Sequence, residues 1–131
     1  SVIDLDNNMT GHWAWDFGDL VRSVSFSRGG FDKLDYQACI AGFLAGRGDK
    51  PDPDELLTEH LATAPAFLAF MLGLRFLTDH LAGDEYFAVP KHGDNLQRAI
   101  EQFELFNQFQ SNEDRMRVCA QDGLGQLTAL T

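Results

Sequence analysis

The chain has few of the residues that stabilise small disulfide-bonded or zinc-bound domains. Its 131 residues include only two cysteines, Cys39 and Cys119, and neither belongs to a Cys-x-x-Cys pair. A zinc site or a redox motif therefore has no support, and a reducing compartment is expected. Basic residues are also few, ten against twenty acidic ones, which gives a net charge of −10. Such a chain repels the phosphates of nucleic acid and of an anionic membrane, so neither partner is expected.

Long uninterrupted apolar runs are absent as well. The most apolar stretch, 64–77, is broken by Pro65 and Arg75, and no basic segment precedes an apolar one as in a secretion signal. We therefore expect a cytoplasmic protein. The chain is rich in core-forming residues, with 44% hydrophobic residues and eleven phenylalanines. A single domain spanning 1–131 is expected, because one core typically forms from about 100–150 residues.

Apolar residues at three- and four-residue steps predict a mainly α fold, with one short β-favouring segment at Ser1–Leu5. The first helix is expected to begin at Asp16 as its N-cap and to end at 28–30. A second helix should open at Asp32 or Asp35 and close at 46–48.

The second half of the chain predicts further helices around an apolar centre. A third helix runs from Pro53 through Leu61, and Pro65 starts or kinks a central helix that Gly83 stops. Residues 86–89 allow an extended segment. The last helix begins near Asp94, and its apolar side is formed by Leu96, Ile100, Phe103 and Phe106. After residue 117 the glycine-rich tail is expected to fray.

Asp4 and Asp6 follow the β-favouring segment, where two carboxylates two residues apart converge only if the strand turns. They form either a simple turn with a side-chain cap or a site for a hard cation such as magnesium. A calcium EF-hand loop starting at Asp4 fails, because Met9 stands where glycine is needed and Trp15 where glutamate is needed. An aspartate-nucleophile phosphatase fails because the remaining chain does not alternate strands with helices.

A kinase-like phosphotransferase fits the order of the motifs. Four separated blocks occur in sequence: Ile3–Asp6, Trp15–Arg22, Leu74–Phe87 and Asn95–Arg98. With these blocks, residues from about 2 to 109 resemble the C-terminal part of the aminoglycoside-phosphotransferase-like superfamily, most closely its N-acetylhexosamine kinase-like branch. The resemblance implies the helical C-lobe portion of a protein-kinase-like fold.

The resemblance also implies roles for the N-terminal aspartates. Asp4 would bind Mg²⁺ on the ATP phosphates with Asp6 as a second ligand, while Asp16, Asp19 and Arg22 would support the active site. Residues 16–18 spell the Asp-Phe-Gly magnesium motif of protein kinases, but in this branch its equivalent is 4–6. Residues 92–94 spell the start of a catalytic loop, but they follow Asp4 when they should precede it, so we interpret them as a loop and a helix start.

Arg75 and Asp79 lie four residues apart on the central helix, so they share a face and can form an ion pair. The alternative is that both line the sugar pocket, as the resemblance implies. There, a donor fixed in the pocket would reject substrates that lack its partner. His12, His60 and His80 share no ligand spacing and are interpreted as ordinary surface or helix residues.

In such kinases the catalytic loop, the glycine-rich loop and the ATP-anchoring lysine precede the magnesium aspartate, whereas this chain begins three residues before Asp4. We therefore expect the C-terminal part of a phosphotransferase that uses ATP and Mg²⁺, acts on a sugar or aminoglycoside-like hydroxyl, and is inactive alone. The expected partner is the missing lobe, in cis or in trans. The alternatives are a kinase-derived helical interaction module or one half of a split kinase. Apolar residues near Val2, Ile3, Trp13 and Trp15 would favour a homodimer.

Overall fold

The computed structural model describes residues 9–47, 54–87 and 90–130, and these residues form helices joined by turns, without a strand. The helices are α2 (Met9–Arg28), α3 (Lys33–Arg47), α4 (Asp54–Leu81), α5 (Asp94–Ser111) and α6 (Glu113–Leu130). The mainly α class predicted from sequence is thereby confirmed. The expected β segment at Ser1–Leu5 lies outside the described residues.

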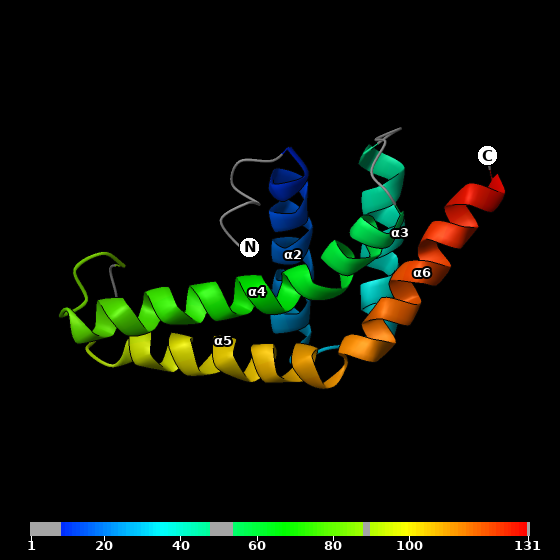
Figure 1. Cartoon of the computed structure of the whole chain (residues 1–131). Helices are drawn as coiled ribbons and strands as arrows, with labels where there is room; N and C mark the ends of the chain where they lie inside the picture. The colour runs from blue at the N-terminus through cyan, green and yellow to red at the C-terminus, as the bar shows by residue number, and fades with distance from the viewer. Residues whose placement is uncertain (1–8, 48–53, 88–89, 131) are drawn as a thin grey trace.

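Helix α4 is the longest of these helices and lies at the centre of the fold (Figure 1). Helix α5 runs back along it as an antiparallel neighbour, and α2 crosses it. Helices α3 and α6 pack against each other at the end where α4 begins. The core lies between these helices and includes the fully buried Phe17, Tyr36, Ile40, Leu61 and Phe109.

Helix α2 begins at Met9 and not at Asp16, so the expected N-cap is wrong. Asp16 lies inside the helix on its exposed face, where its side chain faces solvent. The end of the helix was predicted correctly. Gly29 and Gly30 adopt φ values of 89° and 154°, and the Gly30 N–H donates to the Ser25 carbonyl at 2.8 Å. Glycine reaches this backbone region without steric cost, which is why the helix stops there.

Asp32, one of the two aspartates predicted to open this helix, caps α3. Its Oδ1 accepts a hydrogen bond from the Asp35 N–H at 3.0 Å, which satisfies one of the backbone donors that a helix start leaves unpaired. The Arg28 guanidinium forms an ion pair with Asp35 across the turn, with an Nε–Oδ2 distance of 3.0 Å. These contacts fix the direction in which the chain leaves α2.

The third and fourth expected helices form one continuous helix, α4, with Pro65 inside it. Proline has no N–H to donate to the carbonyl four residues earlier, which is that of Leu61. The hydroxyl of Tyr36 donates to this carbonyl at 2.6 Å. Figure 1 shows α4 changing direction between its shorter first part and its longer remainder. A side chain from α3 therefore supplies the bond that Pro65 removes from α4.

Within α4, the segment Leu56–Leu81 is long and apolar enough to cross a membrane by length and composition. In this structure it packs against α2, α5 and α6. Gly83 follows the helix with a φ of 94°, in agreement with the predicted stop.

The buried face of α5 differs from the expected one. Leu96 and Ile100 are 37% and 42% exposed, whereas the residues facing the core are Asn95, Ala99, Gln102, Leu105 and Phe109. The expected face is therefore correct only in part: Phe106 packs against the core and Phe103 against Phe70 of α4, whereas Leu96 and Ile100 are exposed. Where the sequence suggested a fraying tail, residues 113–130 form α6, which buries Met116, Cys119, Ala120 and Leu124.

Candidate functional site

Asp79 organises the turn that connects α4 to α5. Its carboxylate is 5% exposed and accepts hydrogen bonds from the N–H of Tyr86 at 2.6 Å and of Phe87 at 2.9 Å. The side-chain amide of the fully buried Asn95 donates to the same carboxylate at 2.9 Å. A buried carboxylate is stable only when it is hydrogen-bonded, and here both of its oxygens are engaged. Asp79 therefore holds the turn against the start of α5.

Arg75 is the expected partner of Asp79, but the ion pair does not form. No hydrogen bond or ion pair joins Arg75 to any residue in the described part of the chain, and its side chain is exposed. The two residues therefore have different roles. The Asp79 carboxylate binds the turn, and the guanidinium of Arg75 keeps its five N–H donors available.

Arg75 stands between two hollows in the surface of α4. One hollow, of about 170 Å³, is bounded by Trp15, Asp19 and Arg22 from α2 and by 67–75 from α4. The other, of about 790 Å³, lies between the last turns of α4 and the following turn, with Leu74, Thr78, Glu85, Tyr86 and Phe87 on its walls. Arg75 and Met71 line both. We call these two hollows the Arg75 groove.

Asp19 and Arg22 lie on the α2 wall of this groove. The Arg22 guanidinium contacts one Asp19 oxygen with Nη2 at 2.6 Å and with Nε at 2.9 Å. Its Nη1 also donates to Oε1 of Gln102 in α5 at 3.4 Å. Arg22 therefore ties α2 to α5 and supports the wall of the groove. Asp16, which was grouped with these residues from sequence, lies on an exposed face of α2 and does not line the groove.

The expected magnesium ligands, Asp4 and Asp6, lie outside the described residues. The structure therefore gives no geometry for this metal site, and the assignment stays a prediction.

Asp84 is a polar residue of the turn that sequence reasoning did not single out by itself. Its Oδ1 accepts from Asn95 at 3.0 Å, and its Oδ2 lies 3.0 Å from Nδ1 of His92. The hydrogen bond from His92 and, to a smaller extent, that from Asn95 hold the pKa of Asp84 below its ordinary value, against the opposing effect of desolvation. The sequence feature that could have indicated this group of Asp84, His92 and Asn95 is the pair of glycines, Gly83 and Gly93, at which the chain turns.

No family model matches the chain, and no solved structure matches it. The class of protein that the structure itself defines is a helical domain with an arginine-centred groove beside its longest helix.

Proposed function

We propose that this chain is the C-terminal, helical part of a small-molecule phosphotransferase that uses ATP and Mg²⁺, and that the Arg75 groove contributes to the acceptor site. The acceptor is a sugar or an aminoglycoside-like molecule with a hydroxyl that receives the phosphoryl group. The observation that supports this proposal is Arg75, an exposed guanidinium without a protein partner among the described residues, placed where two hollows meet.

The chemistry of the groove suits a sugar. Small-molecule sites combine apolar and aromatic walls with a few polar groups that fix orientation. Here Trp15 and Phe67 form an aromatic pair, with ring centroids 5.9 Å apart, beside the smaller hollow. Arg75 offers donors to hydroxyl or amide oxygens, and Glu85 offers an acceptor on the other side. An uncharged sugar or an N-acetyl sugar uses both kinds of group.

The chemical step needs residues that these 131 do not contain. Phosphoryl transfer depends on a positioned base, a nucleotide-binding lobe and the metal ion. In this proposal Asp4, with Asp6, would hold the Mg²⁺, and the base and the nucleotide-binding groups would come from a second lobe. Losing one well-placed donor can cost about 10²–10³ in rate, so the chain alone should show no turnover. A second lobe, in cis or in trans, would supply the missing groups.

The acceptor half of the proposal is tested by calorimetric titration of the chain with galactose, N-acetylglucosamine and N-acetylgalactosamine. We expect at least one sugar to bind, and Arg75→Ala to weaken it about 10-fold or more, because hydrogen bonds to a charged group contribute roughly 1.5–3 kcal/mol. Arg115→Ala in α6 removes the same charge from an exposed position and is the matched control. Binding that is absent for all three sugars, or equal in wild type and Arg75→Ala, would contradict the assignment.

Nucleotide binding is tested by a separate titration. We expect titration with ATP and MgCl₂ to give no binding heat for these 131 residues alone, because the proposal assigns nucleotide binding to the second lobe. Tight binding of Mg-ATP would show that the nucleotide site is contained in these residues. It would contradict the proposal that a second lobe binds the nucleotide.

A helical interaction module is the second candidate, favoured by exposed apolar side chains in and after the last turns of α4. Tyr86 and Leu81 are 82% and 77% exposed, and Leu74 is 39% exposed within the larger hollow. Such side chains suit a partner polypeptide as well as a sugar. The two candidates differ in the effect of Leu81→Asp: a partner interface would be weakened, whereas sugar binding at Arg75 would not change.

A further inference from the structure

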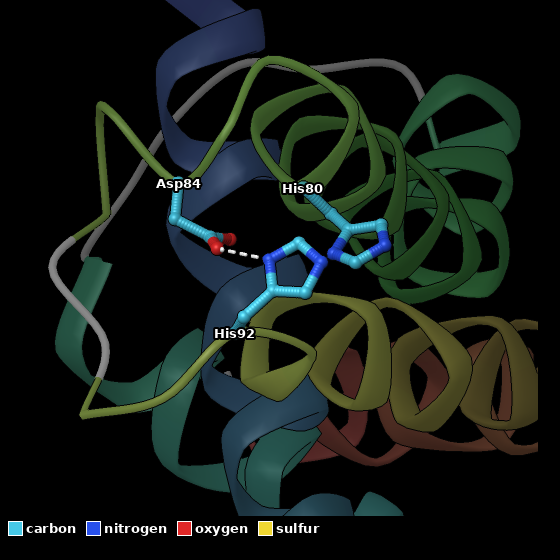
Figure 2. Close-up of side chains that lie close together, drawn as sticks. All are labelled: His80, Asp84 and His92. Atoms are coloured by element: carbon cyan, nitrogen blue, oxygen red, sulfur yellow. Dashed lines mark hydrogen bonds and ion pairs between the residues drawn. The ribbon is translucent and has the colours of Figure 1, made fainter.

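Three side chains that are separated in the sequence meet at the end of the α4–α5 hairpin (Figure 2). His80 belongs to the last turn of α4, Asp84 lies in the turn that follows, and His92 comes just before α5. One potential ligand atom from each lies within 4.8 Å of the other two. The rings of His80 and His92 stack with centroids 4.9 Å apart, and Nδ1 of His92 points to Oδ2 of Asp84.

The backbone and neighbouring side chains hold Asp84 in place. Asp84 adopts a φ of 63°, which is rare for a residue other than glycine. Its N–H donates to the Asp79 carbonyl at 2.8 Å, and Asn95 donates to its Oδ1 at 3.0 Å. The second oxygen, Oδ2, is thereby directed to the histidine side. A hydrogen bond to the far oxygen of a ligand carboxylate is the arrangement that orients ligands in known metal sites.

His80 contributes a second, independent feature. Its Nδ1 is buried and has no hydrogen-bond partner in the described part of the chain. Leaving a buried polar atom unpaired costs free energy, so each such atom in a folded protein calls for an explanation. The ring of His80 lies next to that of His92 in Figure 2. A cation held between His80, His92 and Asp84 would give this nitrogen a partner.

We propose that His80, Asp84 and His92 form a binding site for a divalent transition-metal ion of the Zn²⁺ type. Two imidazole nitrogens and one carboxylate oxygen are a donor set that Zn²⁺ accepts, with water in the fourth position. Zinc–ligand bonds of about 2.1 Å place tetrahedral ligand atoms roughly 3.4 Å apart, so the widest separation in the cluster must close by up to about 1.4 Å, whereas Nδ1 of His92 and Oδ2 of Asp84 are already 3.0 Å apart. His92 is 76% exposed, so its side chain has room to adjust when an ion binds.

This site is distinct from the magnesium site expected at Asp4 and Asp6, and it does not depend on the proposed phosphotransferase activity. Mg²⁺ prefers oxygen ligands in octahedral geometry, so a site with two imidazoles selects against it. The bound ion would join α4 to the start of α5 through the same turn that Asp79 organises. That turn also forms one wall of the Arg75 groove through Tyr86 and Phe87.

The test is calorimetric titration of the chelator-treated, full 131-residue chain with ZnCl₂, repeated with CoCl₂. We expect one ion per chain and, for Co²⁺, the intense visible absorption of a four-coordinate complex. His80→Gln, Asp84→Asn and His92→Gln should each weaken Zn²⁺ binding at least 10-fold. Glu85→Gln, which removes a neighbouring exposed acid, and Asp4→Asn combined with Asp6→Asn should leave it unchanged.

His92→Gln is the decisive variant, because its side chain is exposed and its replacement should leave the circular dichroism spectrum unchanged. If the chain binds no Zn²⁺ at one equivalent, or if His92→Gln binds it as tightly as wild type, the cluster is a hydrogen-bonded turn and the proposal is wrong. Sugar binding that depends on Arg75 would be unaffected by either result, so the two proposals fail separately.

Discussion

The hydroxyl of Tyr36 resolves a conflict that Pro65 creates in the middle of α4. Without an N–H at residue 65, the Leu61 carbonyl has no helical partner, and the fully buried Leu61 leaves little access for water. Tyr36 is itself buried, and burial raises the pKa of its phenol above the ordinary value. Burial therefore favours the neutral phenol, which is the form that can donate a hydrogen bond. One hydrogen bond of 2.6 Å thus explains how a proline is accommodated inside this helix.

Tyr36→Phe is expected to lower the free energy of unfolding by about 1–3 kcal/mol, because it leaves the buried Leu61 carbonyl without a donor. Pro65→Ala restores the helical N–H, so Tyr36→Phe should cost less in the Pro65→Ala background. Urea denaturation of the four proteins measures this coupling as a double-mutant cycle. Tyr86→Phe, at an exposed position, is the matched control and should be neutral. Equal costs of Tyr36→Phe in both backgrounds would show that Pro65 and Tyr36 are not coupled.

The candidate site shows what sequence can and cannot predict at the residue scale. The sequence placed Arg75 and Asp79 on one helix and proposed either an ion pair or a shared pocket. The structure places both beside the same hollow but commits Asp79 to the N–H groups of Tyr86 and Phe87. Spacing on a helix reveals which side chains are neighbours there. It does not reveal that a turn several residues later will return and bind one of them.

Between elements, close packing depends on glycines inside the helices. A Cβ added at Gly18 would lie 2.7 Å from the Ala64 carbonyl oxygen, at the crossing of α2 and α4. At Gly73 it would meet the Phe103 ring at 2.6 Å, and at Gly123 it would meet Ile40 at 2.7 Å. At Gly18 the neighbour is backbone and cannot give way, whereas at Gly73 and Gly123 a neighbouring side chain would have to shift. This closeness is the packing reason for helical glycines that lower intrinsic helix propensity.

Gly18→Ala and Gly42→Ala should have opposite effects. We expect Gly18→Ala to destabilise the fold by about 1–3 kcal/mol, because the new methyl group meets rigid backbone and forces the helices apart. Gly42 lies within α3 with open space around it, so Gly42→Ala should stabilise the fold by roughly 0.5–1 kcal/mol through better helix propensity. Thermal denaturation of both variants measures the difference. A stabilising Gly18→Ala would mean that α2 does not cross α4 at this point.

Helix α5 shows how tertiary contacts override an apolar pattern. Its apolar residues predicted a core face through Leu96 and Ile100, yet the structure turns Asn95 and Gln102 inward. Asn95 is held there by the carboxylates of Asp79 and Asp84, and Gln102 accepts a hydrogen bond from Arg22. Partnered polar groups can be buried at little net cost, so these hydrogen bonds allow Asn95 and Gln102 to face inward. These partners come from other helices and turns, so the apolar pattern within α5 does not predict them.

At the scale of the whole molecule, Arg117 connects the last helix, α6, to α4. Its guanidinium binds Glu59 of α4 with two hydrogen bonds, Nε–Oε2 at 2.8 Å and Nη2–Oε1 at 3.0 Å. Its Nη2 also lies 3.4 Å from Oε2 of Glu113 in α6. The Arg117 hydrogen bond lowers the pKa of Glu59 below its ordinary value, which desolvation opposes. In a chain with net charge −10, this contact attaches a helix that the sequence alone did not predict.

The Glu59–Arg117 pair should make stability depend on acid pH. A carboxyl group whose pKa is lower in the folded state stabilises that state above the unfolded pKa of about 4.3, and this contribution is lost as the pH falls through the folded pKa. Glu59→Gln should therefore lower the free energy of unfolding at pH 7 by up to about 1 kcal/mol, as expected for a partly exposed pair, and should have a smaller effect near pH 3. Urea denaturation at both pH values measures the change, with Glu104→Gln as an exposed control. The same loss at both pH values would contradict an ionic contribution.

The sequence by itself determined the helical class, the ends of α2 and α4 at glycines, and the start of α3 at one of two aspartates, Asp32 or Asp35. These features depend on backbone preferences and on side chains a few residues away, so local sequence contains their causes. Only the tertiary structure decided that α4 continues through Pro65, which way α5 faces, and that residues 113–130 form a packed helix. It alone brought His80, Asp84 and His92 together, because the conformation of the turn between α4 and α5, and not the spacing of the three residues, decides whether their side chains meet.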